Sequence, residues 1–543
     1  MNKRNIIMVL LAIVIIGVAI FAMTNMNSST TSSINIDASA LEDGGSLIVD
    51  GKNLEKNKFN FHTESEDANA ILVKNGGALK LADSLINKSG DSKTEGDDAD
   101  FYGVNSAVLV NTNGSLDVSN CEIVTNSKGS NAIFVTNAED SANGDSSQNT
   151  GGQPPEASGD NPQEKAGGQP PEKPQSQDNN GQAPDNNGTQ PPEKPQSQDN
   201  NGQAPDNNGT QPPEKPQSQD NNGQAPNGNG GQPGETGISG TTEAKINNVK
   251  ITTYSDKSRG LDATYNGKIS AENVIINTNG QSCAGLATDR GEGEVHVKNS
   301  EINTGVSKSN GRGSPLIYST GNITLENSKG TSFVSQIACI EGKNSIELSN
   351  CDLTGYGGGN RQDGNKYVDL GGIFIYQSMS GDANIGTSHF IAENSKLTIP
   401  EESPVYKEAP MFHVTNTACV IDLKNTELNF GSTTFLEASS QNQWGNTGSN
   451  GGIVELNTDS EKIDGNITVD SISSLTWNMK NTEFKGAINS TGNTTVNVTS
   501  GSTWTLTGDS SVSALEVSGD INYGDYSLSV GNKTYNSSNP FKG

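Results

Sequence analysis

The sequence predicts an all-β chain that winds into a parallel β-helix solenoid, with an N-terminal membrane helix and a long disordered insert. Three observations predict this architecture. Hydrophobic residues make up only 30% of the 543 residues, well below the roughly 45–50% of globular domains. Short strand-like segments recur at a nearly constant spacing, and one long stretch contains almost no apolar residue. Thin coils that each bury a few side chains between neighbours need only such a lean core.

The N-terminus carries an export signal. Lys3 and Arg4 precede an apolar run of 18 residues from Ile6 to Met23, which is on the border between a signal peptide and a membrane span. No small-x-small cleavage site follows, so we favour an uncleaved anchor over a secreted protein. The basic residues place the N-terminus in the cytoplasm. We assign 1–26 to a signal-anchor or signal peptide and 27–40 to a polar linker, and we expect the remainder on the extracellular face of the membrane or secreted.

Strand-like segments end in asparagine at regular intervals. Examples are "SLDVSN", "KISAEN", "EVHVKN", "NITLEN", "SIELSN" and "VIDLKN", in which apolar residues alternate with polar ones as in strands with one buried face. The asparagines are Asn120, Asn248, Asn273, Asn299, Asn327, Asn350, Asn394, Asn425 and Asn481.

The spacing of these asparagines predicts one coil per repeat. Coils of about 24 residues, each with three short strands, place equivalent residues about 4.8 Å apart along the solenoid. Asparagine tolerates the left-handed backbone of a tight bend, and its amide can hydrogen-bond the next asparagine in the stack. We therefore expect a structural asparagine ladder. A row of ligand-binding amides is the alternative.

The chain divides at a change of composition. We expect the first coils at 41–138, a disordered insert at 139–240, the main β-helix with a C-terminal cap at 241–535, and a tail at 536–543. A 21-residue repeat opens at Gln169, Gln190 and Gln211 within the insert and has no apolar position, so it cannot form a core. We predict that the insert loops out of one rod. Two separate domains are the alternative.

Charge and cysteine content limit the function classes. The net charge of −28 disfavours nucleic acid and anionic polymers, unless a cation such as calcium bridges them. The five cysteines have no metal-ligand spacing. Cys121 and Cys351 follow an asparagine in the same pattern, and we interpret them as stacked, buried small residues.

The stacked-strand pattern resembles the pectate-lyase-like right-handed β-helix superfamily, in which asparagine ladders lie at a turn between sheets. The segments "GLATDRG", "GSPLIYSTGNITLENS", "IEGKNSIELSN", "YQSMSGDANIGTSHF" and "WGNTGSNGGIVELN" resemble the β-helix region of adhesin-like microbial surface proteins. The resemblance covers roughly 41–138 and 241–535. It implies a right-handed solenoid, but the same fold carries lyases, hydrolases and adhesins.

Catalytic motifs of the related enzymes are missing. The coil regions contain no GHG or RIK motif, and the only DD pair, Asp97-Asp98, lies in a polar loop. We therefore identify no catalytic residue, no resident cofactor and no metal ligand. His296 and His389 lie in strand-like contexts and are expected to face outward from their strands.

Two polar clusters are candidate sites for binding a carbohydrate or a cation. Stacked turns can bring one set of side chains to a single face, where carboxylates with arginine suit a cation or a sugar acid. A glycine-rich loop from Gly355 to Gly372 supplies the second set, with aromatic and charged side chains. Solvated turns with incidental salt bridges are the alternative for both. The first set is Arg259, Asp262, Asp289, Arg290 and Glu341, and the second is Tyr356, Arg361, Asp363 and Tyr367.

These features favour a non-enzymatic, adhesin-like or structural surface protein that binds glycans or a cell-surface partner. The alternative is a polysaccharide lyase or glycoside hydrolase that acts on one face of the solenoid. A third hypothesis is a cell-envelope spacer without a ligand.

Overall fold

The computed structural model describes residues 34, 36–93, 101–138, 239–307, 313–358, 362–363, 366–367, 369–378 and 380–542. The N-terminal apolar run and most of the expected insert, residues 139–238, lie outside these residues. In the part of the chain that is described, no helix is long and apolar enough to cross a membrane.

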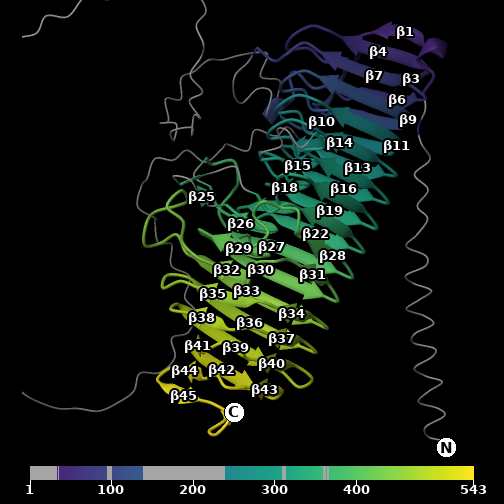
Figure 1. Ribbon diagram of the computed structural model, residues 1–543. Coiled ribbons are helices and arrows are strands. Elements are labelled where there is room, and N and C mark those ends of the chain that lie inside the picture. Colours follow the sequence, from purple (N-terminus) through teal and green to yellow (C-terminus); the bar gives the residue numbers. More distant parts are fainter. Residues whose placement is uncertain are drawn as a thin grey trace, which may run out of the picture. The chain divides into compact units, whose positions relative to one another are not determined.

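The described chain is all-β and consists of long stacks of parallel strands (Figure 1). Each coil contributes three strands in turn, so the stacks form a parallel β-helix with three faces. The first face is a 13-stranded sheet, which we call the first sheet. A 23-stranded sheet forms the second face and most of the third, because strands β9 and β11 continue across the bend between them.

The strands of the first sheet are β2 (Leu47–Asp50), β5 (Ile71–Lys74), β8 (Val108–Val110), β10 (Ile133–Thr136), β12 (Leu261–Thr264), β15 (Leu286–Thr288), β18 (Ile317–Ser319), β21 (Ala338–Glu341), β26 (Ile373–Tyr376), β29 (Phe412–Thr415), β32 (Thr434–Ala438), β35 (Asn466–Val469) and β38 (Ile488–Ser490). The second face contains β3 (Asn53–Asn57), β6 (Ala78–Ala82), β9 (Ser115–Asn126), β11 (Glu243–Thr253), β13 (Lys268–Glu272), β16 (Glu294–Lys298), β19 (Asn322–Glu326), β22 (Ser345–Ser349), β27 (Thr387–Glu393), β30 (Thr417–Lys424), β33 (Gly452–Asp459), β36 (Ser474–Lys480), β39 (Asn493–Val498) and β42 (Ala514–Val517).

The third face contains β1 (Glu42–Gly45), β4 (Phe59–Thr63), β7 (Leu85–Ser89), the second halves of β9 and β11, β14 (Ile275–Thr278), β17 (Glu301–Thr304), β20 (Lys329–Ser332), β23 (Asp352–Gly355), β28 (Lys396–Thr398) and β31 (Glu427–Asn429). A four-stranded sheet follows with β34 (Lys462–Asp464), β37 (Glu483–Lys485), β40 (Thr503–Thr505) and β43 (Asp520–Asn522). The remaining elements are the 3₁₀ turn η1 (Ala38–Ala40), the short hairpin β24 (Gln362–Asp363) and β25 (Lys366–Tyr367), and the terminal strands β41 (Ser510–Val512), β44 (Leu528–Val530) and β45 (Lys533–Tyr535).

The coils before and after the insert are neighbours in one stack. Strand β9 pairs with β11 on both sides of the bend, from Ser115 opposite Glu243 to Thr125 opposite Thr253. Strand β10 pairs with β12 in the same way. The two ends of the intervening segment meet at one turn, where the Thr242 hydroxyl donates to Asn137 Oδ1 at 2.7 Å.

A single left-handed residue makes the bend between the second and third faces. All nine asparagines of the expected ladder have φ between 47° and 57°, the region that asparagine tolerates best among residues with a Cβ. Several amides bond directly along the stack: Asn248 donates to Asn120 at 2.8 Å, and Asn425 donates to Asn394 at 2.8 Å. Other amides reach a neighbouring carboxylate instead, as Asn299 does with Glu272 at 2.9 Å.

The residue after each of these asparagines is buried; it is serine, threonine or cysteine in seven coils and valine in the other two. The Ser300 hydroxyl accepts the Val274 N–H at 3.1 Å, and the Ser328 hydroxyl accepts the Ser300 N–H at 3.0 Å. Cys121 and Cys351 occupy equivalent positions and are fully buried. Burial raises the pKa of the Cys121 thiol to about 12 and that of Cys351 to about 11, so both remain protonated and unreactive at neutral pH.

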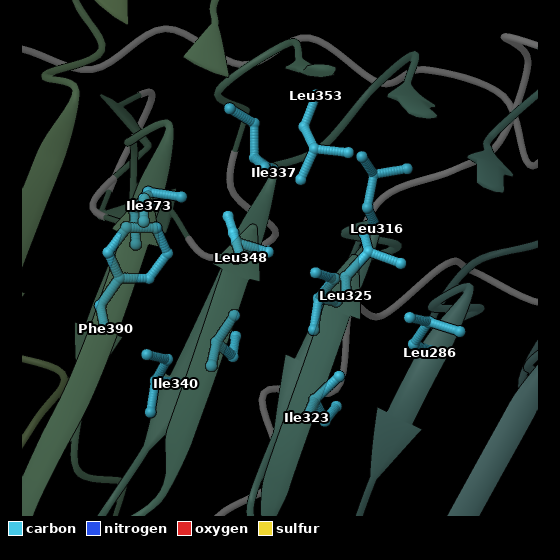
Figure 2. Close-up of a cluster of buried hydrophobic side chains, with 14 of the residues drawn as sticks. Leu286, Leu316, Ile323, Leu325, Ile337, Ile340, Leu348, Leu353, Ile373 and Phe390 are labelled. Atoms are coloured by element: carbon cyan, nitrogen blue, oxygen red, sulfur yellow. The ribbon is translucent and has the colours of Figure 1, made fainter. Parts of the chain in front are cut away.

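One apolar core extends along the stack from Val49 to Leu528. Register places identical positions above one another, so Ile323 lies between Val295 and Ile346 on neighbouring strands. Figure 2 shows part of this core, where Ile323 and Leu325 from β19 and Leu348 from β22 lie among leucine and isoleucine side chains of the adjacent coils. Each coil therefore completes the burial of its neighbours, as in other solenoids.

The two ends of the stack are terminated differently. Strands β44 and β45 pair antiparallel and close the C-terminal end. At the N-terminal end, Lys56 occupies the position opposite the inward-facing Leu81, and its ammonium lies 4.8 Å from the centre of the Phe59 ring. An inward-pointing charge at an edge strand discourages pairing with another chain.

We predict that Asn350→Ala destabilises the stack more than Asn350→Gly. Alanine loses the 3.2 Å amide contact with Asn327 and keeps the strain of φ 54°, for a loss of about 1–3 kcal/mol. Glycine removes the strain and loses only the amide contact. Urea unfolding of both variants measures the difference. Equal losses for both variants would show that the left-handed bend imposes no strain.

A buried carboxyl makes stability depend on pH. Glu461 follows the bend residue Ser460 and is 1% exposed; its Oε1 accepts the Thr426 N–H at 2.8 Å. Burial raises its pKa to about 7 from an ordinary value of 4.5. The folded state binds this proton more tightly than the unfolded state does. Below pH 4.5 the carboxyl is protonated in both states and its burial costs little. As pH rises from 4.5 through 7, the unfolded state ionises first and the free energy of unfolding falls.

We predict that Glu461→Gln removes this loss, which is roughly 3 kcal/mol across the window. Urea unfolding at pH 4.5 and pH 8 should show a smaller difference for the variant than for the native chain. Glu516→Gln, at an exposed strand position, is the control and should leave the pH dependence unchanged. A native pH profile that persists in Glu461→Gln would contradict the assignment.

Candidate functional site

Long connections flank only the first sheet in the described coils. The bend between the second and third faces spans a few residues in every coil, for example between Glu272 and Ile275. The longer connections lead into or out of the first sheet, and they include the segments 90–107, 355–372, 377–386 and 439–451. Loops carried by a rigid scaffold are the usual position of binding residues, so the outer side of the first sheet is the candidate site.

The outer side of the first sheet is itself buried. One row of outward residues runs through neighbouring strands in register: Phe134, Asp262, Ala287, Tyr318, Cys339, Phe374 and His413. All except Tyr318 are less than 9% exposed. Strands β10, β12, β21, β26 and β29 are consequently buried at every position. The flanking loops cover this side of the sheet.

Aromatic rings gather in two clusters on this covered side. Phe374, Tyr376 and Trp444 pack together, with the Phe374 and Tyr376 ring centres 4.7 Å apart and those of Tyr376 and Trp444 4.6 Å apart. In the second cluster Tyr102 stacks on Tyr265 at 5.6 Å, next to Phe101. Aromatic rings with a polar tip combine apolar area with hydrogen-bonding capacity.

Arg259, Asp262 and Asp289 form a buried charge cluster at this site. The guanidinium of Arg259 lies 2.8 Å from Asp289 Oδ2 and 3.7 Å from Asp262 Oδ2. Asp262 lies on β12, and Asp289 follows β15 on the neighbouring coil. The side chains of Arg259 and Asp289 are 12% and 7% exposed, and that of Asp262 is fully buried. The structure thus brings three of the sequence-predicted residues together, paired with one another.

Arg290 joins two loops at the end of β15. Its Nε and one terminal nitrogen donate to Asp382 Oδ1 at 3.1 and 2.5 Å. Its guanidinium carbon lies 3.9 Å from the centre of the Phe101 ring, a cation–π arrangement. Phe101 precedes β8 and Asp382 follows β26, so this one side chain connects loops from distant coils.

Glu341 is the last residue of β21, two residues after Cys339, and pairs with Tyr376 of β26. Its Oε2 accepts the Tyr318 hydroxyl at 2.9 Å, and its Oε1 accepts the Ser378 N–H at 3.2 Å and the Ser378 hydroxyl. Burial raises the pKa of the Glu341 carboxyl above its ordinary value, against the lowering effect of these hydrogen bonds.

The structure describes the glycine-rich loop only in part. The Tyr356 ring lies 6.2 Å from that of Phe333, at the edge where the chain enters the first sheet. Asp363 and Tyr367 belong to the β24–β25 hairpin, where Asp363 pairs with Lys366 and Tyr367 with Gln362. Arg361 lies outside the described residues.

The histidines differ in exposure. His296 lies outward on β16 and contacts the Thr324 hydroxyl at 2.8 Å through Nδ1. His389 is exposed on β27. His413, in contrast, is buried on the outer side of the first sheet, where its Nδ1 lies 2.9 Å from the Leu370 carbonyl oxygen. Among the described residues, no group of three or more histidine, cysteine or acidic side chains is arranged to hold a metal ion.

The sequence did not predict the aromatic clusters, the contact of Asp382 with Arg290, or that of Lys343, whose ammonium lies 2.7 Å from Glu292 Oε1. The sequence does contain a pattern that indicates burial of the outer side of the first sheet. The strands "IFVT" at 133–136 and "IFIY" at 373–376 are apolar at successive positions, a pattern that indicates burial on both faces.

Comparison with known proteins assigns no family. No protein-family model matches the chain, and no curated protein is significantly similar to it in sequence.

We predict that Arg259→Gln destabilises the protein by about 3 kcal/mol or more, because it leaves two buried carboxylates without their cation. The matched control is Lys485→Gln, which removes an exposed ion pair of 3.0 Å with Asp464 and should cost less than about 1 kcal/mol. Urea unfolding of the two variants measures both effects. Equal losses would show that the buried cluster does not stabilise the covered side.

Proposed function

We propose that this protein is an extracellular, adhesin-like surface protein: a right-handed β-helix of the pectate-lyase-like kind, held at the membrane through its N-terminal segment, which binds glycans with the outer side of its first sheet. One observation carries the proposal: the long connections of the described coils all flank that sheet, and aromatic and charged side chains gather beneath them.

The chemistry of this side suits a carbohydrate better than other ligands. Tyr102, Tyr265, Tyr318 and Tyr376 offer apolar ring faces beside hydroxyl groups, and Arg290 and Lys343 add cations. Sugar rings present the matching combination of C–H faces and hydroxyls. A stack of similar coils also permits several weak contacts along one polymer, which multiply through effective concentration. The excess of acidic residues favours neutral glycans, or acidic ones bridged by calcium.

A second candidate function is a polysaccharide lyase or glycoside hydrolase. The buried Glu341 with its raised pKa, together with Arg259 and its two carboxylates, favours this alternative, since carboxyls with perturbed pKa values concentrate at catalytic sites. Against it, each of these carboxylates is engaged with protein groups: Asp289 and Asp262 with Arg259, and Glu341 with Tyr318 and Ser378.

The test incubates the full-length chain in detergent with plant, microbial and mucin polysaccharides, with and without calcium. Each sample reports the protein retained on the polysaccharide and the sugar released from it. We expect retention without release. Tyr102→Ala should lower retention at least about fivefold, because it removes one ring of a stacked pair. Tyr526→Ala, at an exposed position in the last coils, is the control and should leave retention unchanged.

Release of sugar would favour the enzymatic alternative. Absence of retention across the panel would contradict glycan binding, and an equal effect of Tyr526→Ala would place binding elsewhere on the surface.

A further inference from the structure

The described residues of the segment 377–386 (377–378 and 380–386), which we call the strap, run back along the earlier coils. The strap leaves the first sheet after β26, yet Asp382 reaches Arg290 at the end of β15, 92 residues earlier in the sequence. Asn384 Nδ2 donates to Glu292 Oε1 at 2.7 Å, and Lys343 Nζ lies 2.7 Å from the same oxygen. The strap thus lies along the edge of the first sheet from β26 to β15.

The strap is held by polar contacts. In its described part, Ala383 is the single buried apolar side chain, and Ile385 is 86% exposed. The Lys343 N–H donates to the Asn384 carbonyl at 2.9 Å, and Gln377 Nε2 donates to the Ala383 carbonyl at 3.2 Å. Segments with few buried apolar contacts open at lower free-energy cost than the strands of a core.

Gly342 permits the close approach of the strap. Its φ is +68°, and a Cβ at this position would lie 2.3 Å from the Asn384 carbonyl oxygen and 2.9 Å from the Ala383 Cβ. A larger residue would therefore lift the strap from the sheet. Residue 342 directly follows Glu341, whose carboxylate accepts the Ser378 N–H at the start of the strap.

An aromatic cluster that includes one thiol adjoins the start of the strap, which directly follows Tyr376. Cys339, Tyr318, Phe374, Tyr376 and Trp444 form one cluster on the outer side of the first sheet. The Tyr318 hydroxyl donates to Glu341 Oε2 at 2.9 Å, and Glu341 Oε1 accepts the Ser378 N–H of the strap at 3.2 Å. A glycan cannot reach these rings while the covering residues stay in place, because the cluster members are nearly all buried.

We propose that the strap is a hinged cover, fastened by the Arg290–Asp382 and Glu292–Asn384 contacts, whose opening exposes the Cys339 aromatic cluster without unfolding the coils. The proposal rests on the proposed function for the ligand that the exposed cluster would receive, a glycan. The opening itself is a property of this chain alone.

The experiment measures thiol labelling in the full-length chain without any polysaccharide. Ala383→Cys places a reporter on the buried side of the strap, and Cys339 reports on the cluster beneath it. Cys283, fully buried in the coils, is the internal reference. Peptide mass spectrometry follows labelling by iodoacetamide at each position. Asp382→Asn removes the charge that Arg290 binds and should raise labelling at 383 and at Cys339 at least about tenfold, with no change at Cys283.

The control is Asp464→Asn, which removes the exposed ion pair with Lys485 and should change none of the rates. Labelling of Cys339 in the chain with Asp382→Asn alone repeats the measurement without the introduced cysteine. The proposal is overturned if position 383 is labelled as slowly as Cys283 with and without Asp382→Asn, or if Cys339 stays unlabelled while position 383 reacts. Failure of glycan binding with faster Cys339 labelling would instead refute the proposed function and leave the hinged cover intact.

Discussion

The residue-for-residue stacking of one coil on the next is the constraint on which the rest of the structure depends. Every strand obtains its hydrogen bonds from the coils above and below, so each coil must bend where its neighbours bend. At the bend between the second and third faces, one left-handed residue followed by one buried residue recurs in coil after coil. Extra residues are accommodated only where the chain enters or leaves the first sheet, which concentrates the loops on one side.

Because the loops gather on this side, the outer side of the first sheet is buried and its charges are paired. Loops from distant coils cover it, so its outward residues are buried and its charges must be paired. Arg259 with two aspartates, Arg290 with Asp382, and Glu341 with Tyr318 and Ser378 are the result. Buried charges are retained only with such partners. Some of these pairs, such as Arg290 with Asp382, join a loop to the sheet, and in the hinged cover that we propose they can separate while the coils stay folded.

Local patterns in the sequence were sufficient to predict the stacked strands, since alternation and a recurring asparagine are properties of single coils. Asn248 and Asn425 could be identified because their bends need a left-handed residue. Arg259, Asp262 and Asp289 could be grouped because neighbouring coils bring them together at a known spacing. The contact of Asp382 with Arg290 could not be predicted, because it spans 92 residues and depends on how one loop folds back. The grouping of Tyr356 with the other side chains of the glycine-rich loop rested on the length of that insertion, and it stays a prediction; Tyr356 itself lies beside Phe333, where the chain enters the first sheet.

Hydrogen exchange of the full-length chain, read by mass spectrometry, tests most directly whether the described coils form one stack. If they do, the amides of β9 (Ser115–Asn126) and β11 (Glu243–Thr253) exchange slowly and at similar rates, because the two strands hydrogen-bond each other across the insert. Fast exchange in one strand with slow exchange in the other would mean that the coils on the two sides of the insert belong to separate domains, and it would contradict the account.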